Sequence, residues 1–76
     1  MRTEVLSIWT VYDHPTDYPD IFVARRWIIG EGGHRPTIET IGSTDLEGLR
    51  DELEARGLVC LPREPDDDPK IIESWI

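Results

Sequence analysis

A single segment of this chain repeats leucine at a helical spacing, and the segments around it are rich in β-branched and aromatic residues. Leu46, Leu49 and Leu53 fall at i, i+3 and i+7, which places them on one side of a helix. Thr44, with a glutamate three residues later, predicts a capping box, and Gly57 predicts the left-handed residue that ends the helix. An amphipathic helix of this kind needs a sheet to pack against, so the chain is expected to be an α+β protein.

Five segments have the composition of β-strands. They are residues 4–12, 21–29, 36–41, 58–61 and 71–76. The first is apolar on both faces, which is typical of a central strand. The third is the weakest and has Ile38 and Ile41 as its apolar anchors. We expect one domain over residues 1–76, with a three-to-five-stranded, mainly antiparallel sheet and one helix on one face, in the order β-β-β-α-β-β.

The charge balance narrows the class of partner. The chain has 16 acidic and 8 basic residues, a net charge of −8. A protein that binds nucleic acid or an anionic membrane directly needs a positive surface. The negative electrostatic field of this chain therefore favours a basic protein or nucleoprotein complex as its partner. Cys60 is the one cysteine, and the first residues do not resemble a signal peptide, so we expect a cytoplasmic protein, monomeric or weakly dimeric. The alternative is that acidity serves solubility alone.

Three groups of carboxylates are the candidate partner-binding residues. They are Glu47, Asp51 and Glu54 on the outer side of the expected helix, Asp13, Asp17 and Asp20 in one loop, and Asp66, Asp67 and Asp68 in another. On the helix the three lie within about 60° of one another and no basic residue falls inside that stripe, although Arg50 flanks it. This pattern favours a contact surface for Arg and Lys over mixed surface charge. A solvated surface remains the alternative. We expect no metal site, because three consecutive aspartates do not converge on one ion and the spacing of a calcium loop is absent, and no cofactor.

Other polar side chains suit structural roles. Arg25 and Arg26 point to opposite faces of a strand, where ion pairs with carboxylates or contacts with the Trp9 and Trp27 rings are expected. Cys60 lies in a short apolar strand and is expected to be a buried, inert thiol.

The three tryptophans are expected in the core. Trp75, close to the end of the chain, has an alternative role as an exposed interface anchor.

Several stretches together resemble a group of short bacterial proteins of unknown function. They are Trp9-Thr-Val-Tyr-Asp-His-Pro, Asp17-Tyr-Pro, Phe22-Val-Ala-Arg-Arg-Trp27, Leu61-Pro-Arg and Asp68-Pro-Lys-Ile-Ile-Glu-Ser-Trp75. This resemblance implies no activity and no catalytic residues. In size and acidity alone, the chain is also similar to anti-CRISPR proteins and other phage-type DNA mimics, which implies binding to the basic surface of a nucleic-acid-binding machine.

Three hypotheses about function follow. The first is a non-enzymatic, acidic protein-binding module, an inhibitor or DNA mimic that occupies a basic, nucleic-acid-binding surface of its partner. The second is a bacterial adaptor or subunit that binds through its sheet face and C-terminus. The third is a small enzyme that uses Asp13, His14 or Cys60, which we disfavour because adjacent residues seldom form a productive acid–base pair.

Overall fold

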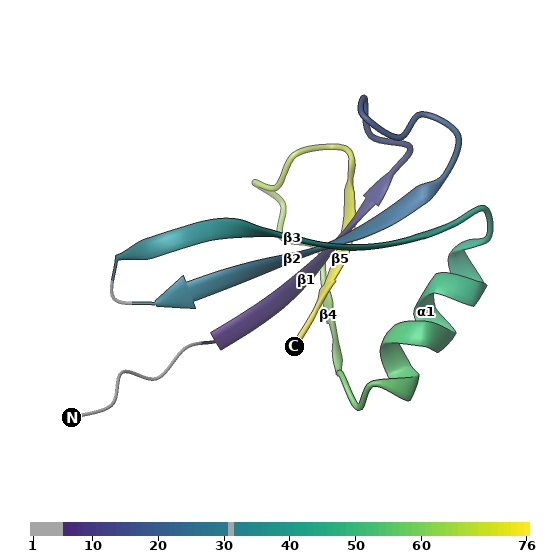
Figure 1. The fold of residues 1–76 in the computed structure, drawn as a ribbon. Coiled ribbons are helices and arrows are strands. Elements are labelled where there is room, and N and C mark those ends of the chain that lie inside the picture. The colour runs from purple at the N-terminus through teal and green to yellow at the C-terminus, as the bar shows by residue number, and fades with distance from the viewer. Residues whose placement is uncertain (1–5, 31) are drawn as a thin grey trace.

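The computed structural model describes residues 6–30 and 32–76. The first two residues of the predicted strand 4–12 therefore lie outside the described residues. The described residues form five strands and one helix (Figure 1): β1 Leu6–Asp13, β2 Phe22–Gly30, β3 Gly33–Ser43, α1 Leu46–Ala55, β4 Cys60–Pro62 and β5 Ile71–Trp75. The strands make one antiparallel sheet in the order β3-β2-β1-β5-β4. The predicted α+β class, element order and central position of β1 are confirmed.

The helix begins one residue later than the capping box predicted. Asp45, and not Thr44, is the N-cap: its backbone is extended and its side chain accepts the N–H of Gly48 at 3.0 Å. The reason is Ser43, whose hydroxyl accepts the N–H of Asp45 and donates to its carbonyl, closing the turn between β3 and α1. A Cβ on Gly48 would stand 3.3 Å from that hydroxyl, so the glycine makes room for the cap.

The predicted end of the helix is confirmed. Gly57 has φ +81° and donates to the carbonyl of Glu54 at 2.9 Å, while the N–H of Leu58 reaches the carbonyl of Leu53 at 3.4 Å. These two bonds are the Schellman pattern, in which the residue after the glycine contacts the last turn of the helix. Leu58 accordingly packs against the core, so the same turn that ends α1 also directs the chain back to the sheet.

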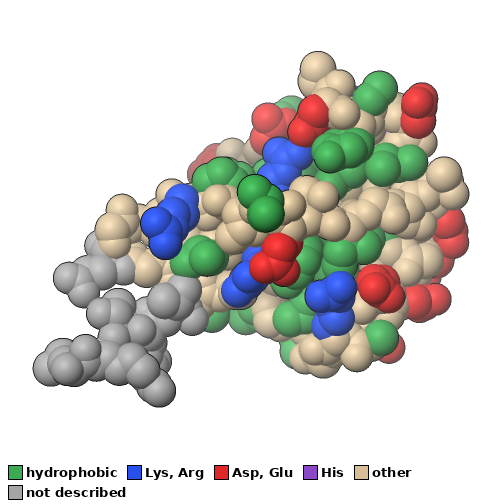
Figure 2. Space-filling model, viewed as in Figure 1, with side chains coloured by type: hydrophobic (Ala, Val, Ile, Leu, Met, Phe, Trp, Pro, Cys, Tyr) green, Lys and Arg blue, Asp and Glu red, His purple; other side chains and the backbone are tan. Residues whose placement is uncertain are grey.

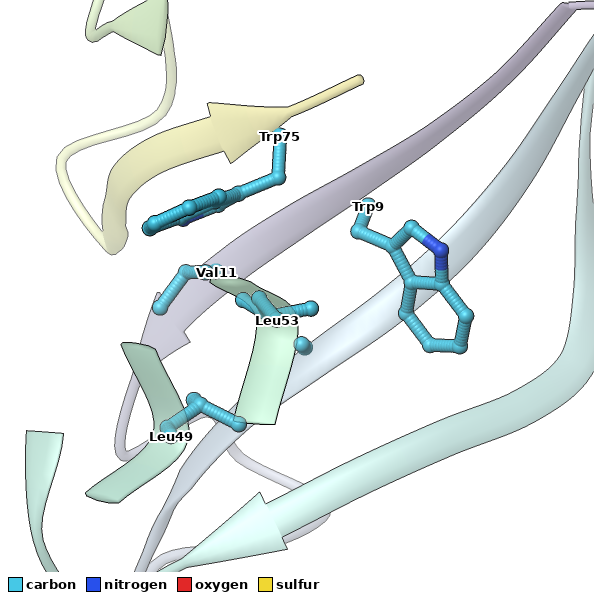
Figure 3. Packing of buried hydrophobic residues seen from close by; sticks show 6 residues of the cluster. Trp9, Val11, Leu49, Leu53 and Trp75 are labelled. Carbon is cyan, nitrogen blue, oxygen red and sulfur yellow. The ribbon is translucent and has the colours of Figure 1, made fainter. Parts of the chain in front are cut away.

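The core lies between α1 and one face of the sheet (Figure 3). Leu49 and Leu53 are fully buried, as predicted, against the side chains of Trp9, Val11 and Trp75. Because Trp75 is 5 % exposed, its alternative role as an exposed anchor is wrong: β5 pairs directly with β1, and this register turns the indole inward beside that of Trp9.

A buried ion pair joins the helix to the sheet. Glu73 on β5 is 5 % exposed and accepts two hydrogen bonds from the Arg50 guanidinium, at 3.1 and 2.8 Å, and one from the Trp75 indole N–H at 2.8 Å. Burial alone would raise the pKa of the Glu73 carboxyl, but the hydrogen bonds from Arg50 and Trp75 outweigh burial and hold this pKa below its ordinary value. The carboxylate is therefore charged at neutral pH and fully bonded inside the core.

Strand β3 contains a bulge that the sequence did not predict. Between the pairs Trp27–Pro36 and Arg25–Thr40, three residues of β3 stand opposite one residue of β2. The Thr37 hydroxyl bridges the gap by donating to the carbonyl of Arg26 and accepting the N–H of Glu39. Ile38 is turned outward at the bulge and is 99 % exposed, so its predicted role as an apolar anchor is wrong. A bulge and a proline on an edge strand also discourage pairing with another strand.

Candidate binding surface

The two acidic loops meet at one end of the sheet. Residues 14–21 connect β1 to β2 and residues 63–70 connect β4 to β5. Because β1 and β5 are antiparallel neighbours, the end of one lies beside the start of the other: the N–H of Asp13 donates to the carbonyl of Lys70 at 2.8 Å, and the Lys70 ammonium lies 3.3 Å from the carbonyl of His14. Carboxylates that are about 50 positions apart in the sequence therefore belong to one surface (Figure 1).

Three of the nine candidate carboxylates have ion-pair partners. Asp13 contacts the adjacent His14 imidazole, Asp17 pairs with Arg25, and Glu47 pairs with Arg50 at 2.8 Å. The interpretation of the helix carboxylates as an unpaired row is therefore wrong for Glu47, because Arg50 lies one turn away and reaches it while bonding Glu73.

The other six candidates make no ion pair with any residue that the structure describes. They are Asp20, Asp51, Glu54, Asp66, Asp67 and Asp68. Two of them bond only to their own loop: Asp67 accepts the N–H of Glu64 at 3.0 Å and Asp68 that of Lys70 at 2.8 Å. Arg63 of the same loop donates to the backbone carbonyl of Asp67 at 2.7 Å and not to a carboxylate.

Acidic side chains lie at this end and along the helix, with Lys or Arg side chains next to several of them (Figure 2). Asp and Glu side chains lie around the two loops and on the side formed by α1, whereas near the β2–β3 hairpin this view shows a basic side chain and no acidic one among the described residues. The register places the start of α1 at the end of the sheet that carries the loops, because Ser43, Phe22 and Asp13 are paired across three strands.

Both arginines of β2 have the predicted kind of partner, although the aromatic contact differs. Arg25 pairs with Asp17 and lies 5.6 Å from the Tyr12 ring, and Arg26 pairs with Glu39. The tryptophan contact belongs to another arginine, Arg56, 5.4 Å from the Trp9 ring. The two arginines of β2 are thus compensated, whereas Asp20, Asp66, Asp67 and Asp68 of the loops make no ion pair with a residue that the structure describes.

The sheet face opposite α1 carries a groove of about 290 Å³. Its walls and floor come from β1, β2, β3, β5 and the second loop: Ile8, Thr10, Tyr12, Trp27, Ile29, His34, Asp67, Ile71 and Ser74. Trp27 is half-buried on this face, so its predicted place in the core is wrong. The sequence signal for this second apolar surface was the presence of apolar residues on both faces of the first predicted strand. That pattern indicated a central strand, but it did not show that α1 would cover only one of its faces.

The residues of the hypothetical enzyme are not brought together. Cys60 pairs with Trp75 on β5, which in turn pairs with Trp9 on β1. His14 follows the other end of β1, roughly 13 Å or more further along the strand. Cys60 is exposed on the sheet edge, so its predicted burial is wrong. Local desolvation of its sulfur and the charge of Glu73 raise the pKa of this thiol, which disfavours the reactive thiolate.

No three His, Cys, Asp or Glu side chains within residues 6–30 and 32–76 are placed to hold a metal ion together. Over the same residues, α1 is too short and too polar to cross a membrane.

Comparison of the chain with protein-family models, curated proteins and solved structures finds no match. Over residues 6–30 and 32–76, the fold and surface define the class: an acidic α+β domain with one sheet face covered by a helix, a groove on the other face, and Asp20, Asp66, Asp67 and Asp68 at one end without an ion pair.

Proposed function

We propose that this chain is a non-enzymatic, acidic binding module that occupies a basic, nucleic-acid-binding surface of a partner protein. The observation that supports it best is the meeting of two acidic loops at one end of the sheet, where Asp20, Asp66 and Asp68 have no cationic partner among the described residues. A surface of this sign attracts the Lys and Arg side chains that otherwise hold phosphate.

The mechanism is competition for the same cations. Carboxylates at the loop end, continued by Asp51 and Glu54 on α1, pair with the partner's Lys and Arg side chains and exclude the nucleic acid from that site. Charge-assisted hydrogen bonds supply the contacts, and long-range attraction raises the association rate. Both effects weaken as salt increases, because the Debye length shrinks to a few ångströms.

The ion pairs in the structure decide at which residues a test should reverse the charge. Glu47 shares Arg50 with the buried Glu73, so a lysine there would disturb the core as well as the surface. Asp20 and Asp66 are exposed and make no ion pair among the described residues, so the double variant D20K/D66K reverses charge at the loop end with the fold kept. D51K/E54K makes the same change of charge on the helix side.

The test is affinity capture from a nuclease-treated bacterial lysate at low and high salt, followed by competition with duplex DNA or RNA for each captured protein. We expect nucleic-acid-binding proteins that are lost at high salt and displaced by nucleic acid, and capture by D20K/D66K reduced by about tenfold or more. Equal capture by the parent and by both double variants, or capture that salt leaves unchanged, would show the proposal to be wrong.

A further inference from the structure

Charge alone does not explain the groove on the sheet face opposite α1. Trp27, Tyr12 and Ile8 lie on neighbouring strands of this face and line the groove, with Ile29 and Ile71 beside them. In a two-layer domain an apolar sheet face is ordinarily covered by another element. Here α1 covers only the other face.

The chain covers part of this second face itself. At the loop end, Val23 is 1 % exposed, and Ile21 lies so close over Gly42 that a Cβ there would stand 2.6 Å from the Ile21 side chain. The cover stops there, and the strands beyond it line the groove. The open part is thus a bounded site with a wall at the loop end.

That wall carries more acidic than basic groups: its loop holds three consecutive aspartates, and Arg63 of the same loop donates to the backbone carbonyl of Asp67 at 2.7 Å. Asp67 is half-buried and lines the groove, while Asp66 and Asp68 flank it in the same loop. None of the three has an ion-pair partner among the described residues. The Asp67 carboxylate is held in place by the N–H of Glu64, so its charge is fixed beside the apolar floor.

The charge of this wall decides between occupants. A second copy of this chain would bring another net charge of −8 toward the same carboxylates, and like charges repel. The complementary occupant carries an apolar side chain for the floor and a cation for the wall. The contact between Arg25 and the Tyr12 ring shows that an aromatic ring on this face already accepts a guanidinium.

We infer that the groove receives a segment of the basic partner in which an apolar side chain stands next to Lys or Arg. The apolar side chain lies on Trp27 and Ile8, and the cation pairs with Asp67. The positive charge of the partner rests on the proposed function. The groove adds an apolar contact with a defined direction, which distinguishes one basic surface from another.

The test uses three synthetic eight-residue peptides that alternate Arg with Leu, Arg with Ser, and Glu with Leu. Binding is followed by NMR, with the indole N–H of Trp27 and the amides of Ile8 and Ser74 reporting on the groove, and amides of α1 reporting on the helix side. We expect the Arg-Leu peptide to shift the groove signals and to bind at least about tenfold more tightly than the Arg-Ser peptide, because only leucine buries apolar surface. The Glu-Leu peptide is expected not to bind.

Matched variants identify the contacts. Asp67→Asn keeps the acceptor for the Glu64 N–H and removes the charge, with Glu52→Gln as its control on α1, since Glu52 pairs with Arg56 and is not one of the partner-binding carboxylates. Ile8→Thr removes apolar surface from the groove, and the same change at Ile38, exposed at the bulge of β3, is its control. We expect each groove variant to weaken the binding of the Arg-Leu peptide by about threefold or more and each control to leave this affinity unchanged. Thermal unfolding confirms that all four variants are folded.

Each contrary result has its own meaning. Equal binding of the Arg-Ser and Arg-Leu peptides, shifts confined to α1, or no binding of the Arg-Leu peptide would overturn the groove inference and leave the proposed function to its capture test. Equal binding of the Glu-Leu and Arg-Leu peptides would overturn the inference and would also count against a basic partner.

Discussion

Replacement of Glu73 by glutamine tests whether the buried ion pair holds α1 on the sheet. The glutamine has nearly the same shape, but its one oxygen cannot serve the two Arg50 bonds and the Trp75 N–H that the carboxylate accepts. Its amide group instead faces a donor. That donor, Nη2 of Arg50, is left without an acceptor, and the attraction between opposite charges is lost.

The magnitude follows from burial. With its oxygen in the place of Oε2, the glutamine still accepts the Trp75 N–H and the Nε–H of Arg50, so the donor that loses its acceptor is Nη2 of Arg50. A hydrogen bond to a charged group contributes about 1.5–3 kcal/mol, and the Arg50 side chain is 35 % exposed, so water recovers part of the loss. We expect E73Q to lower the free energy of unfolding by about 1–2 kcal/mol, which in a domain of this size lowers Tm by roughly 5–15 °C.

The control is Glu52→Gln. Glu52 and Arg56 form an exposed pair at 3.7 Å on the same helix, where loss of the charge is expected to change stability by less than about 0.5 kcal/mol. Urea unfolding, followed by tryptophan fluorescence, measures both variants. An E73Q protein as stable as the parent, or no less stable than E52Q, would refute the reasoning.

The same pair predicts a pH dependence. The pKa of Glu73 lies below its ordinary value of 4.5, so the carboxylate contributes stability above the unfolded-state pKa, and this contribution is lost as the pH falls through the pKa of the folded state. The difference in stability between the parent and E73Q is therefore constant at neutral pH and shrinks in acid, where the protonated glutamic acid resembles glutamine. A difference that persists unchanged in strong acid would contradict the assigned cause.

Further variants test the helix boundaries and the core by urea unfolding. Asp45→Ala is expected to cost about 1 kcal/mol because it removes the N-cap acceptor, while Thr44→Ala changes stability by less than about 0.5 kcal/mol; the reverse order would restore the predicted capping box. Gly57→Ala is expected to cost about 1 kcal/mol at φ +81°, and a neutral effect would contradict the left-handed C-terminus. Leu53→Ala leaves a cavity in a fully buried site and is expected to cost about 2–5 kcal/mol, so a loss below 1 kcal/mol would contradict the packing of α1.

The candidate site was only partly predictable. Its residues could be chosen from the sequence because acidic side chains are visible there, but their pairing depends on which cation each one meets after folding. Glu47 is not part of an unpaired row because Arg50 reaches it from one turn away, whereas Asp66 and Asp68 make no ion pair with any residue in 6–30 or 32–76. The groove was not predicted, because a tryptophan such as Trp27 gives the same sequence pattern whether its strand face is buried in the core or exposed.

What the sequence determined by itself is local and periodic. The leucine spacing and Gly57 define the helix and its end, and the apolar faces of β1 define a central strand, since each pattern is set by neighbouring residues. Only the tertiary structure decided that two loops about 50 positions apart share one end, that Ile38 points outward from a bulge, and that α1 covers one sheet face and leaves the other open. These outcomes depend on strand register and on which surfaces meet, and a contact across the sheet has no periodic signature along the chain.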